Sequence, residues 1–154
     1  MKWFTAFVAV LLLVFPMQRA AASDQKPQAA MNDIVQVRVW SVHATNKSNE
    51  MDDRLGRVSK HLRNLNFKGF ELLRKDSAAI AVKGAKKFAV AGDRTVRVSV
   101  LSQNEKRARV RVQVSSGKGT LLDTTVSIRR NGFFIVAGPR YKGGILVLPI
   151  FARY

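Results

Sequence analysis

The residues best suited to chemistry are arginines that alternate with small or apolar residues in one short run. Arg107, Arg109 and Arg111 are separated by Ala108 and Val110. In an extended strand every second side chain points to the same face, so the three guanidinium groups would lie about 6–7 Å apart. A guanidinium can donate two parallel hydrogen bonds to a phosphate or a carboxylate. The spacing therefore predicts an anion-binding face, and the alternative is the solvated outer face of an ordinary antiparallel sheet.

Two neighbouring runs extend the same pattern. Residues 94–101 place Arg97 and Ser99 opposite a row of valines, and residues 121–130 place Asp123 and Arg129 opposite another apolar row. If the three strands are neighbours, a flat basic face results with Asp123 as its acidic residue. The predicted anion-binding residues on this face are Arg97, Arg107, Arg109, Arg111 and Arg129.

No pattern in the chain predicts catalysis. His43 and His61 are isolated in the sequence, and no carboxylate–histidine spacing indicates a metal site. Residues 116–120 contain Gly-Lys, but a glycine follows the lysine and Val112 occupies the position where a phosphate-binding loop needs glycine. Cysteine is absent, which excludes thiolate metal sites and cysteine nucleophiles. We therefore expect no enzyme, no catalytic residues, no metal and no cofactor.

The elements that would hold the basic face are short strands separated by tight turns. Strand-like runs follow one another after Asn66, at 67–74, 78–82, 87–91, 94–101, 107–114, 121–130, 133–137 and 145–152. Asn131-Gly132 between two of them is a strong hairpin signal, and turns this short join antiparallel strands. With an initial strand at 34–44, the pattern predicts about 7–9 short antiparallel strands, folded as a sandwich or a partly closed barrel.

One segment between the first two strands has helical spacing. Its apolar residues recur at intervals of four and three, which makes a single stripe that we expect to lie on the face of a sheet. Ser48 or Asn49 is the expected cap. The fold class predicted is therefore α+β, mainly antiparallel β with one amphipathic helix. The stripe consists of Met51, Leu55, Val58, Leu62 and Leu65.

The beginning of the chain predicts export. Lys2, a thirteen-residue apolar run and an Ala-x-Ala end at Ala22 are the three parts of a cleavable signal peptide, and the run is too short to span a bilayer. We predict a signal peptide at 1–22, a flexible N-terminal segment at 23–33 and a single domain at 34–154. The protein is expected in the periplasm, in the cell envelope or outside the cell.

The predicted mature chain is strongly basic. Without Lys2 and Arg19 it keeps 25 basic and 10 acidic residues, a net charge of +15. Such a field favours polyanionic partners, although it could also serve solubility alone. Nucleic acid is not expected in an exported compartment. The candidates are lipid headgroups in a peripheral membrane association, lipopolysaccharide, an acidic polymer or an acidic protein.

The last ten residues carry a second interpretation. Leu146, Leu148 and Ile150 alternate on one face of a run that ends at Tyr154. This run resembles the terminal strand of bacterial outer-membrane barrels, and the resemblance implies a small membrane barrel. Several predicted strands are shorter than the 9–11 residues that a membrane strand needs. Pro149 also predicts an edge strand or a bulge here.

The sequence therefore supports three hypotheses. The first is an exported binding or structural module of the cell envelope that engages an anionic partner through its basic β-face. The second is an accessory subunit of an envelope or secretion assembly, which pairs a sheet edge with its partner through contacts near Trp40 or Tyr154. The third is the small outer-membrane β-barrel.

Overall fold

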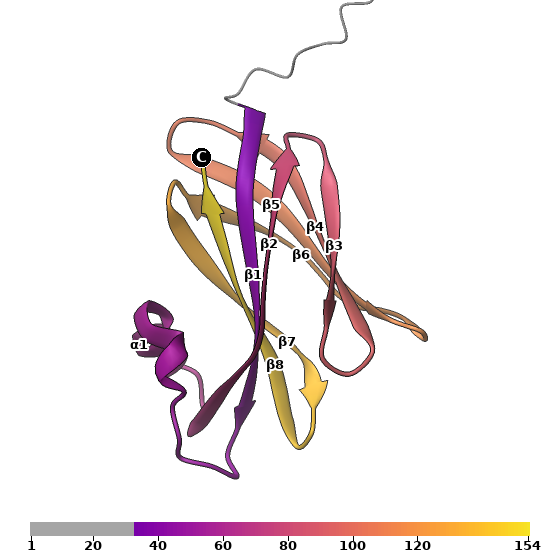
Figure 1. The fold of residues 1–154 in the computed structure, drawn as a ribbon. Helices are drawn as coiled ribbons and strands as arrows, with labels where there is room; N and C mark the ends of the chain where they lie inside the picture. The colour runs from indigo at the N-terminus through magenta and orange to yellow at the C-terminus, as the bar shows by residue number, and fades with distance from the viewer. Residues whose placement is uncertain (1–32) are drawn as a thin grey trace, which may run out of the picture.

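Residues 33–154 are described by the structure, which is a computed structural model. The predicted signal peptide and residues 23–32 of the predicted N-terminal segment lie outside the described residues. The described part contains eight strands and one short helical segment (Figure 1). The strands are β1 (Ile34–Thr45), β2 (Gly69–Ala81), β3 (Ala85–Val90), β4 (Arg94–Gln103), β5 (Arg107–Ser116), β6 (Gly119–Arg129), β7 (Gly132–Tyr141) and β8 (Gly144–Arg153).

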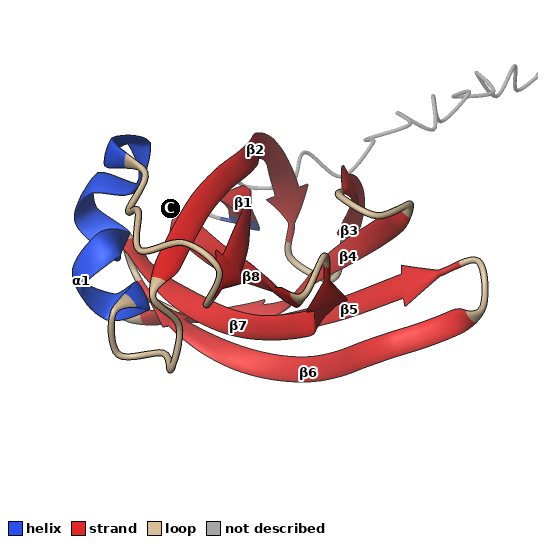
Figure 2. Ribbon diagram, turned by 90° about the horizontal axis from the view of Figure 1, so that it is seen from below, coloured by secondary structure: helices blue, strands red, loops and turns tan. Residues whose placement is uncertain are grey.

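The strands form two antiparallel sheets that pack face to face (Figure 2). Sheet A has the strand order β2-β1-β8-β7, and sheet B has the order β3-β4-β5-β6. The expectation of a mainly antiparallel α+β fold with seven to nine strands is confirmed. Of the two predicted architectures, a sandwich or a partly closed barrel, the structure has the sandwich, because its strands form two separate four-stranded sheets.

The core lies between the two sheets because each strand turns its apolar alternate residues inward. The valines of β4 and β5 pack with the first three valines of β1 and with the leucines of β8, and all of these side chains are shielded from solvent. Burying a valine, leucine or isoleucine stabilises the fold by about 1.5–3 kcal/mol each, before the entropy cost of ordering the chain. The fully buried members include Val35, Val37, Val39, Val96, Val98, Val100, Val110, Val112, Val114, Leu146, Leu148 and Ile150.

Strand β2 corrects the sequence expectation of two strands at 67–74 and 78–82. It runs unbroken through the polar residues Lys75 to Ser77, because each of them pairs with a residue of β1. A bulge at Ser41/Val42 shifts the register beside these residues. Hydrogen bonds to β1, which is distant in the sequence, satisfy the backbone polar groups of these residues. The polar residues themselves give no local signal of this pairing.

Strand β8 corrects one of the two expectations for Pro149, that it marks a sheet edge. β8 is a central strand, with β1 on one side and β7 on the other. Its pairing with β1 runs from Arg153 to Ile150, lapses at Pro149 and Leu148, and resumes at Val147 in the same register. Proline has no N–H to donate, so the interior sheet accommodates it with a local gap in the ladder rather than with an edge.

The helical segment between β1 and β2 covers the outer face of sheet A. It consists of a 3-10 helix, η2 (Asp53–Val58), and one turn of α-helix, α1 (Ser59–Leu62). Its apolar stripe packs on that face as expected, with Leu55, Val58 and Leu62 fully buried. The partners from the sheet include Trp40, Val42, Phe70, Leu72, Phe133, Val147 and Phe151.

The helix is shorter than its apolar spacing predicts, and it begins later. Gly56 has φ 36° and ψ −111°, a conformation that side-chain-bearing residues rarely adopt, and it interrupts the helical backbone. Met51 instead forms an isolated bridge with Phe70 of β2. The N-cap is Asp52, rather than Ser48 or Asn49, because its carboxylate accepts a hydrogen bond from the Arg54 N–H at 2.9 Å.

Asp52 and Arg54 also fasten this segment to the edge of sheet A. Asp52 Oδ2 accepts from the Leu72 N–H at 3.1 Å, and Arg54 Nη2 donates to the Leu72 carbonyl oxygen at 3.0 Å. Hydrogen bonds from Arg54 to Asp52 lower the pKa of that carboxyl well below its ordinary range. The edge strand β2 is thus covered over part of its length, which protects it from pairing with another chain.

Candidate anion-binding face

The outer face of sheet B carries all five of the predicted arginines. Strands β4, β5 and β6 are neighbours in this order, as the hypothesis required. Arg97 of β4 lies opposite Gln113 of β5, and Arg111 of β5 lies between Ser99 of β4 and Thr125 of β6. Each of these arginines is exposed, because it alternates along its strand with residues that point into the core. The five residues brought to one face are Arg97, Arg107, Arg109, Arg111 and Arg129.

Lys87, at the start of the predicted strand 87–91, joins this face, although it was not among the predicted anion-binding residues. It lies in β3, directly opposite Arg97 of β4, and its side chain is exposed. The alternation of Lys87 and Ala89 with buried Phe88 and Val90 was the local signal that could have placed it. The basic face is defined here as Lys87, Arg97, Arg107, Arg109, Arg111 and Arg129.

Arg111 is the residue of the basic face that has an acidic partner. Its Nε donates to Asp123 Oδ1 at 2.8 Å, and its Nη2 contacts the second carboxylate oxygen, so the pair is bidentate. Gln113 Nε2 donates to the same carboxylate at 3.0 Å. These hydrogen bonds lower the pKa of Asp123, first through Arg111, and raise the pKa of Arg111. One acid therefore fixes the centre of the face and leaves the other cations unneutralised.

Like charges oppose each other directly at two places on the basic face. Arg107 of β5 is the cross-strand partner of Arg129 of β6, and Lys87 of β3 is the partner of Arg97 of β4. Within residues 33–154 none of these four side chains forms a salt bridge or a hydrogen bond. Opposed like charges on neighbouring strands destabilise a sheet. A bound anion would supply the opposite charge that the described residues do not provide.

The surface between these strands is shallow. A hollow of about 290 Å³ is lined by Lys87 and Arg97 at its basic side and by hydroxyl and amide side chains elsewhere. No described helix covers this face, since the helical segment lies on sheet A (Figure 2). The hollow offers hydrogen-bond donors on an open floor, which suits an anionic group presented from outside. Its remaining lining residues are Thr95, Gln113, Ser115 and Thr120.

Two exposed leucines accompany the cations. Leu121 of β6 follows the outward alternation that continues to Asp123, and its exposed fraction is 44%. Leu101 occupies the bulge of β4 beside Arg109, and its exposed fraction is 39%. The face therefore presents both cations and a small amount of apolar surface.

The two predicted partner-contact residues lie away from any sheet edge. Trp40 belongs to the central strand β1, where its ring packs on Phe151 at 4.7 Å between centroids and Lys75 Nζ lies 4.2 Å from the ring centre. Tyr154 follows the central strand β8 and packs against the core, and burial raises the pKa of its hydroxyl. The edge strands that a partner strand could pair with are β2 and β7 of sheet A and β3 and β6 of sheet B, and β2 is covered over part of its length.

The histidines have aromatic neighbours. The His43 ring meets Tyr141 edge-on with centroids 5.3 Å apart, and the His61 ring meets Phe133 at 4.9 Å. Among residues 33–154, no group of three histidine, aspartate or glutamate side chains is placed to hold a metal ion.

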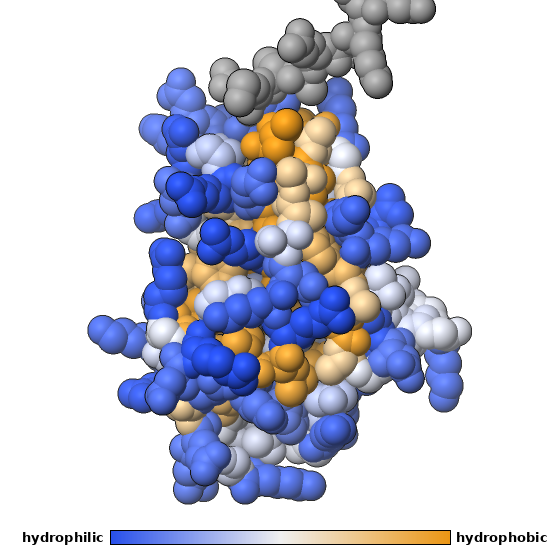
Figure 3. Space-filling model, viewed as in Figure 1, coloured by the Kyte–Doolittle hydropathy of each residue, from blue (hydrophilic) through white to orange (hydrophobic). Residues whose placement is uncertain are grey.

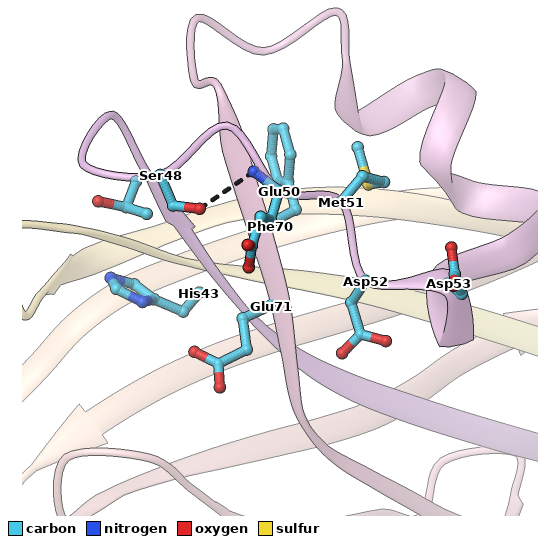
Figure 4. Close-up of a pocket in the computed structure, with 9 residues that line it drawn as sticks. His43, Ser48, Glu50, Met51, Asp52, Asp53, Phe70 and Glu71 are labelled. Carbon is cyan, nitrogen blue, oxygen red and sulfur yellow. Dashed lines mark hydrogen bonds between the residues drawn. The ribbon is translucent and has the colours of Figure 1, made fainter.

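An acidic pocket lies at one end of sheet A, where sequence reasoning identified no site. Glu50, Asp52 and Asp53 from the β1–β2 connection and Glu71 from β2 line a cavity of about 620 Å³, together with His43. Figure 4 shows Glu50 and Glu71 beside β2 and Asp53 apart from them at the start of the helical segment, so the carboxylates are not gathered at one point. Asp52 is already held by Arg54 and Leu72, so its role here is structural.

Comparisons with known proteins identify no relative of this chain. A scan against protein-family models, a search of curated proteins and a search of solved structures each found no match. Within residues 33–154, no helix has both the length and the apolar character needed to cross a membrane. The function must therefore be argued from the residues themselves.

Proposed function

We propose that the protein is an exported cell-envelope module whose basic face binds an anionic surface. The observation that carries the proposal is the pair of unrelieved like-charge contacts, Arg107 against Arg129 and Lys87 against Arg97. A solvated face built only for solubility gains nothing from placing cations directly opposite each other. A face that binds phosphate or carboxylate groups gains a second donor for each of them.

The arrangement of the cations favours a surface over a single extended polymer. They are distributed over all four strands of sheet B, so they form a two-dimensional array rather than one row. Exposed Leu101 and Leu121 add apolar contacts of the kind that peripheral proteins place at the headgroup boundary. Among the anionic partners considered, a membrane rich in acidic lipid headgroups fits this combination best.

The experiment is cosedimentation with vesicles of phosphatidylglycerol and phosphatidylcholine. The test variant is R107S/R109S/R111S, which removes three cations from β5. With each cation near an anionic surface contributing about 1 kcal/mol in general, the loss of three predicts binding roughly a hundredfold weaker. Far-ultraviolet circular dichroism and thermal unfolding establish that the variant is folded.

The matched control removes the same charge from the opposite side of the molecule. K60S/R63S/K68S changes three exposed residues in or after the helical segment, none of which forms a side-chain hydrogen bond or salt bridge in the described part of the chain. We expect this control to bind nearly as well as the wild type. Equal losses in the two variants would mean that only net charge matters, and the basic face would then not be the binding site.

A further inference from the structure

A second basic site lies on the other side of the sandwich. A hollow of about 250 Å³ opens on the outer face of sheet A, beside the helical segment. Three arginines from separate elements line it: Arg38 of β1, Arg57 of η2 and Arg153 of β8. No carboxylate of the described residues lines the hollow, and Gln36, Asn131, Gly132, Phe151 and Ala152 complete it.

The three arginines are positioned to reach one group. Arg38 lies opposite Phe151, and Arg153 lies two residues further along β8, so the two arginines are diagonal neighbours across the β1–β8 pair. Diagonal neighbours on a sheet face are about 7–8 Å apart, which long side chains bridge easily. Arg57 approaches from the last turn of η2. One tetrahedral oxyanion between them could accept hydrogen bonds from all three guanidinium groups.

The guanidinium groups have no competing partner. Among residues 33–154, none of the three forms a salt bridge or a side-chain hydrogen bond. The floor beneath them is held in place, because the Phe151 ring packs between Trp40 at 4.7 Å and Phe133 at 5.4 Å. The hollow therefore combines one aromatic ring held in place with three forked donors that have no partner among the described residues, and such donors recognise phosphate.

The two basic sites face in opposite directions. The basic face is the outer side of sheet B, and the hollow is on the outer side of sheet A, with the core between them. Figure 3 shows the sheet A side, where hydrophilic side chains predominate over a narrower apolar stretch. A protein with anion sites on both sides of a sandwich can contact two surfaces at once.

We propose that the hollow binds the phosphate group of an anionic lipid headgroup, so that the protein bridges two membranes. This inference rests on the proposed function, since one of the two membranes is held by the basic face. The hollow holds the second membrane through Arg38, Arg57 and Arg153. No new fold element is needed, because the two sites lie on the outer sides of the two different sheets.

The test is the clustering of phosphatidylglycerol and phosphatidylcholine vesicles, followed by dynamic light scattering. The wild type should increase the mean particle size severalfold at substoichiometric protein. R38S/R153S should bind the same vesicles in cosedimentation to nearly the wild-type extent but leave their size unchanged. R63S/K68S is the matched control, because it removes two cations from the same side of the molecule outside the hollow. This control should cluster vesicles like the wild type.

The outcomes separate this inference from the proposed function. Wild-type protein that binds vesicles without clustering them, or R38S/R153S protein that clusters them as well as the wild type, would overturn the bridging proposal and leave the basic face intact. Wild-type protein that does not bind vesicles at all would overturn both. Loss of clustering in R38S/R153S alone, with folding unchanged by circular dichroism, would support the second site.

Discussion

The two sheets of this sandwich have similar apolar inner faces, but their outer faces differ in chemistry. Both turn valine, leucine and isoleucine toward the common core. On its outer side, sheet A carries Phe133, Phe151 and other apolar residues and is covered by the helical segment. On its outer side, sheet B carries six cations and no described helix. The alternation of apolar and polar residues that builds a sheet therefore says little about function. The outward-facing side chains determine whether the outer face of a sheet is covered by another element or stays open to a partner.

The helical segment over sheet A contributes to stability, whereas the open outer face of sheet B is the proposed binding surface. Covering sheet A adds a second apolar cluster, and its loss would expose fully buried side chains. Leaving sheet B bare keeps Arg107 opposite Arg129, a contact that costs stability. Changes in the apolar cluster between the helical segment and sheet A should thus act mainly on folding, and changes on the outer face of sheet B should act mainly on binding.

The largest expected effect on stability comes from a change in the helical segment that covers sheet A. Leu62→Ala removes a fully buried side chain that packs between α1 and sheet A, and such truncations typically cost about 2–5 kcal/mol. Urea unfolding followed by circular dichroism measures the change. Thr125→Ala on the bare outer face of sheet B is the control, for which we expect a change within about 0.5 kcal/mol. Similar losses in both variants would mean that the two outer faces contribute equally to folding.

A smaller effect on stability, which depends on pH, is expected from the Asp52–Arg54 ion pair that holds the helical segment on sheet A. In the folded protein the pKa of Asp52 lies below its ordinary value of 3.8, chiefly because the Arg54 side chain donates hydrogen bonds to it. As the pH falls below that value, the unfolded chain binds the proton first. The stabilisation by the Asp52 carboxylate is therefore complete above about pH 5 and is lost progressively in more acidic solution.

Asp52→Asn makes this effect measurable. The variant should unfold at lower urea than the wild type near neutral pH, and the difference should shrink as the pH is lowered from about 5 to about 2. Asp93→Asn is the control, because Asp93 lies in a turn at φ 52°, which asparagine tolerates, and has no salt bridge among the described residues. If the stability difference between the wild type and Asp52→Asn did not change with pH, the ion pair would not be what holds the helical segment on sheet A.

The smallest effect has the opposite sign. Arg129→Glu replaces the like-charge contact with Arg107 by an attractive one, so the variant should be more stable than the wild type by about 0.2–1 kcal/mol at low salt. The same change should weaken vesicle binding. Lys118→Glu in the β5–β6 turn makes the same charge change without facing an arginine, and it should not increase stability. A destabilised Arg129→Glu variant would remove the main support for a face built for binding.

Local patterns predicted the parts of the molecule that depend on neighbouring residues. The period-two alternation in 107–114 placed Arg107, Arg109 and Arg111 on one face, and the spacing of Leu55, Val58 and Leu62 placed the stripe that covers sheet A. These predictions succeeded because each strand or helix turn orients its own side chains. The tight turns also made β4, β5 and β6 neighbours, which assembled the basic face.

The remaining features depend on contacts between distant segments. The continuity of β2 through Lys75 to Ser77 depends on pairing with β1, and the central position of β8 depends on strand order that no local pattern encodes. The late start of the helix follows from the bonds of Asp52 to Leu72, twenty residues later. The hollow on sheet A joins Arg38, Arg57 and Arg153 from three separate segments, so no motif could indicate it.

The most direct test of the central claim is the salt dependence of vesicle binding by the wild type and R107S/R109S/R111S. Screening weakens exposed charge interactions as ionic strength rises, so wild-type affinity should fall steeply between low and physiological salt. If the basic face supplies the charge, the variant should bind more weakly at low salt, and its affinity should depend less on salt. Parallel curves, or a wild-type affinity indifferent to salt, would contradict the account.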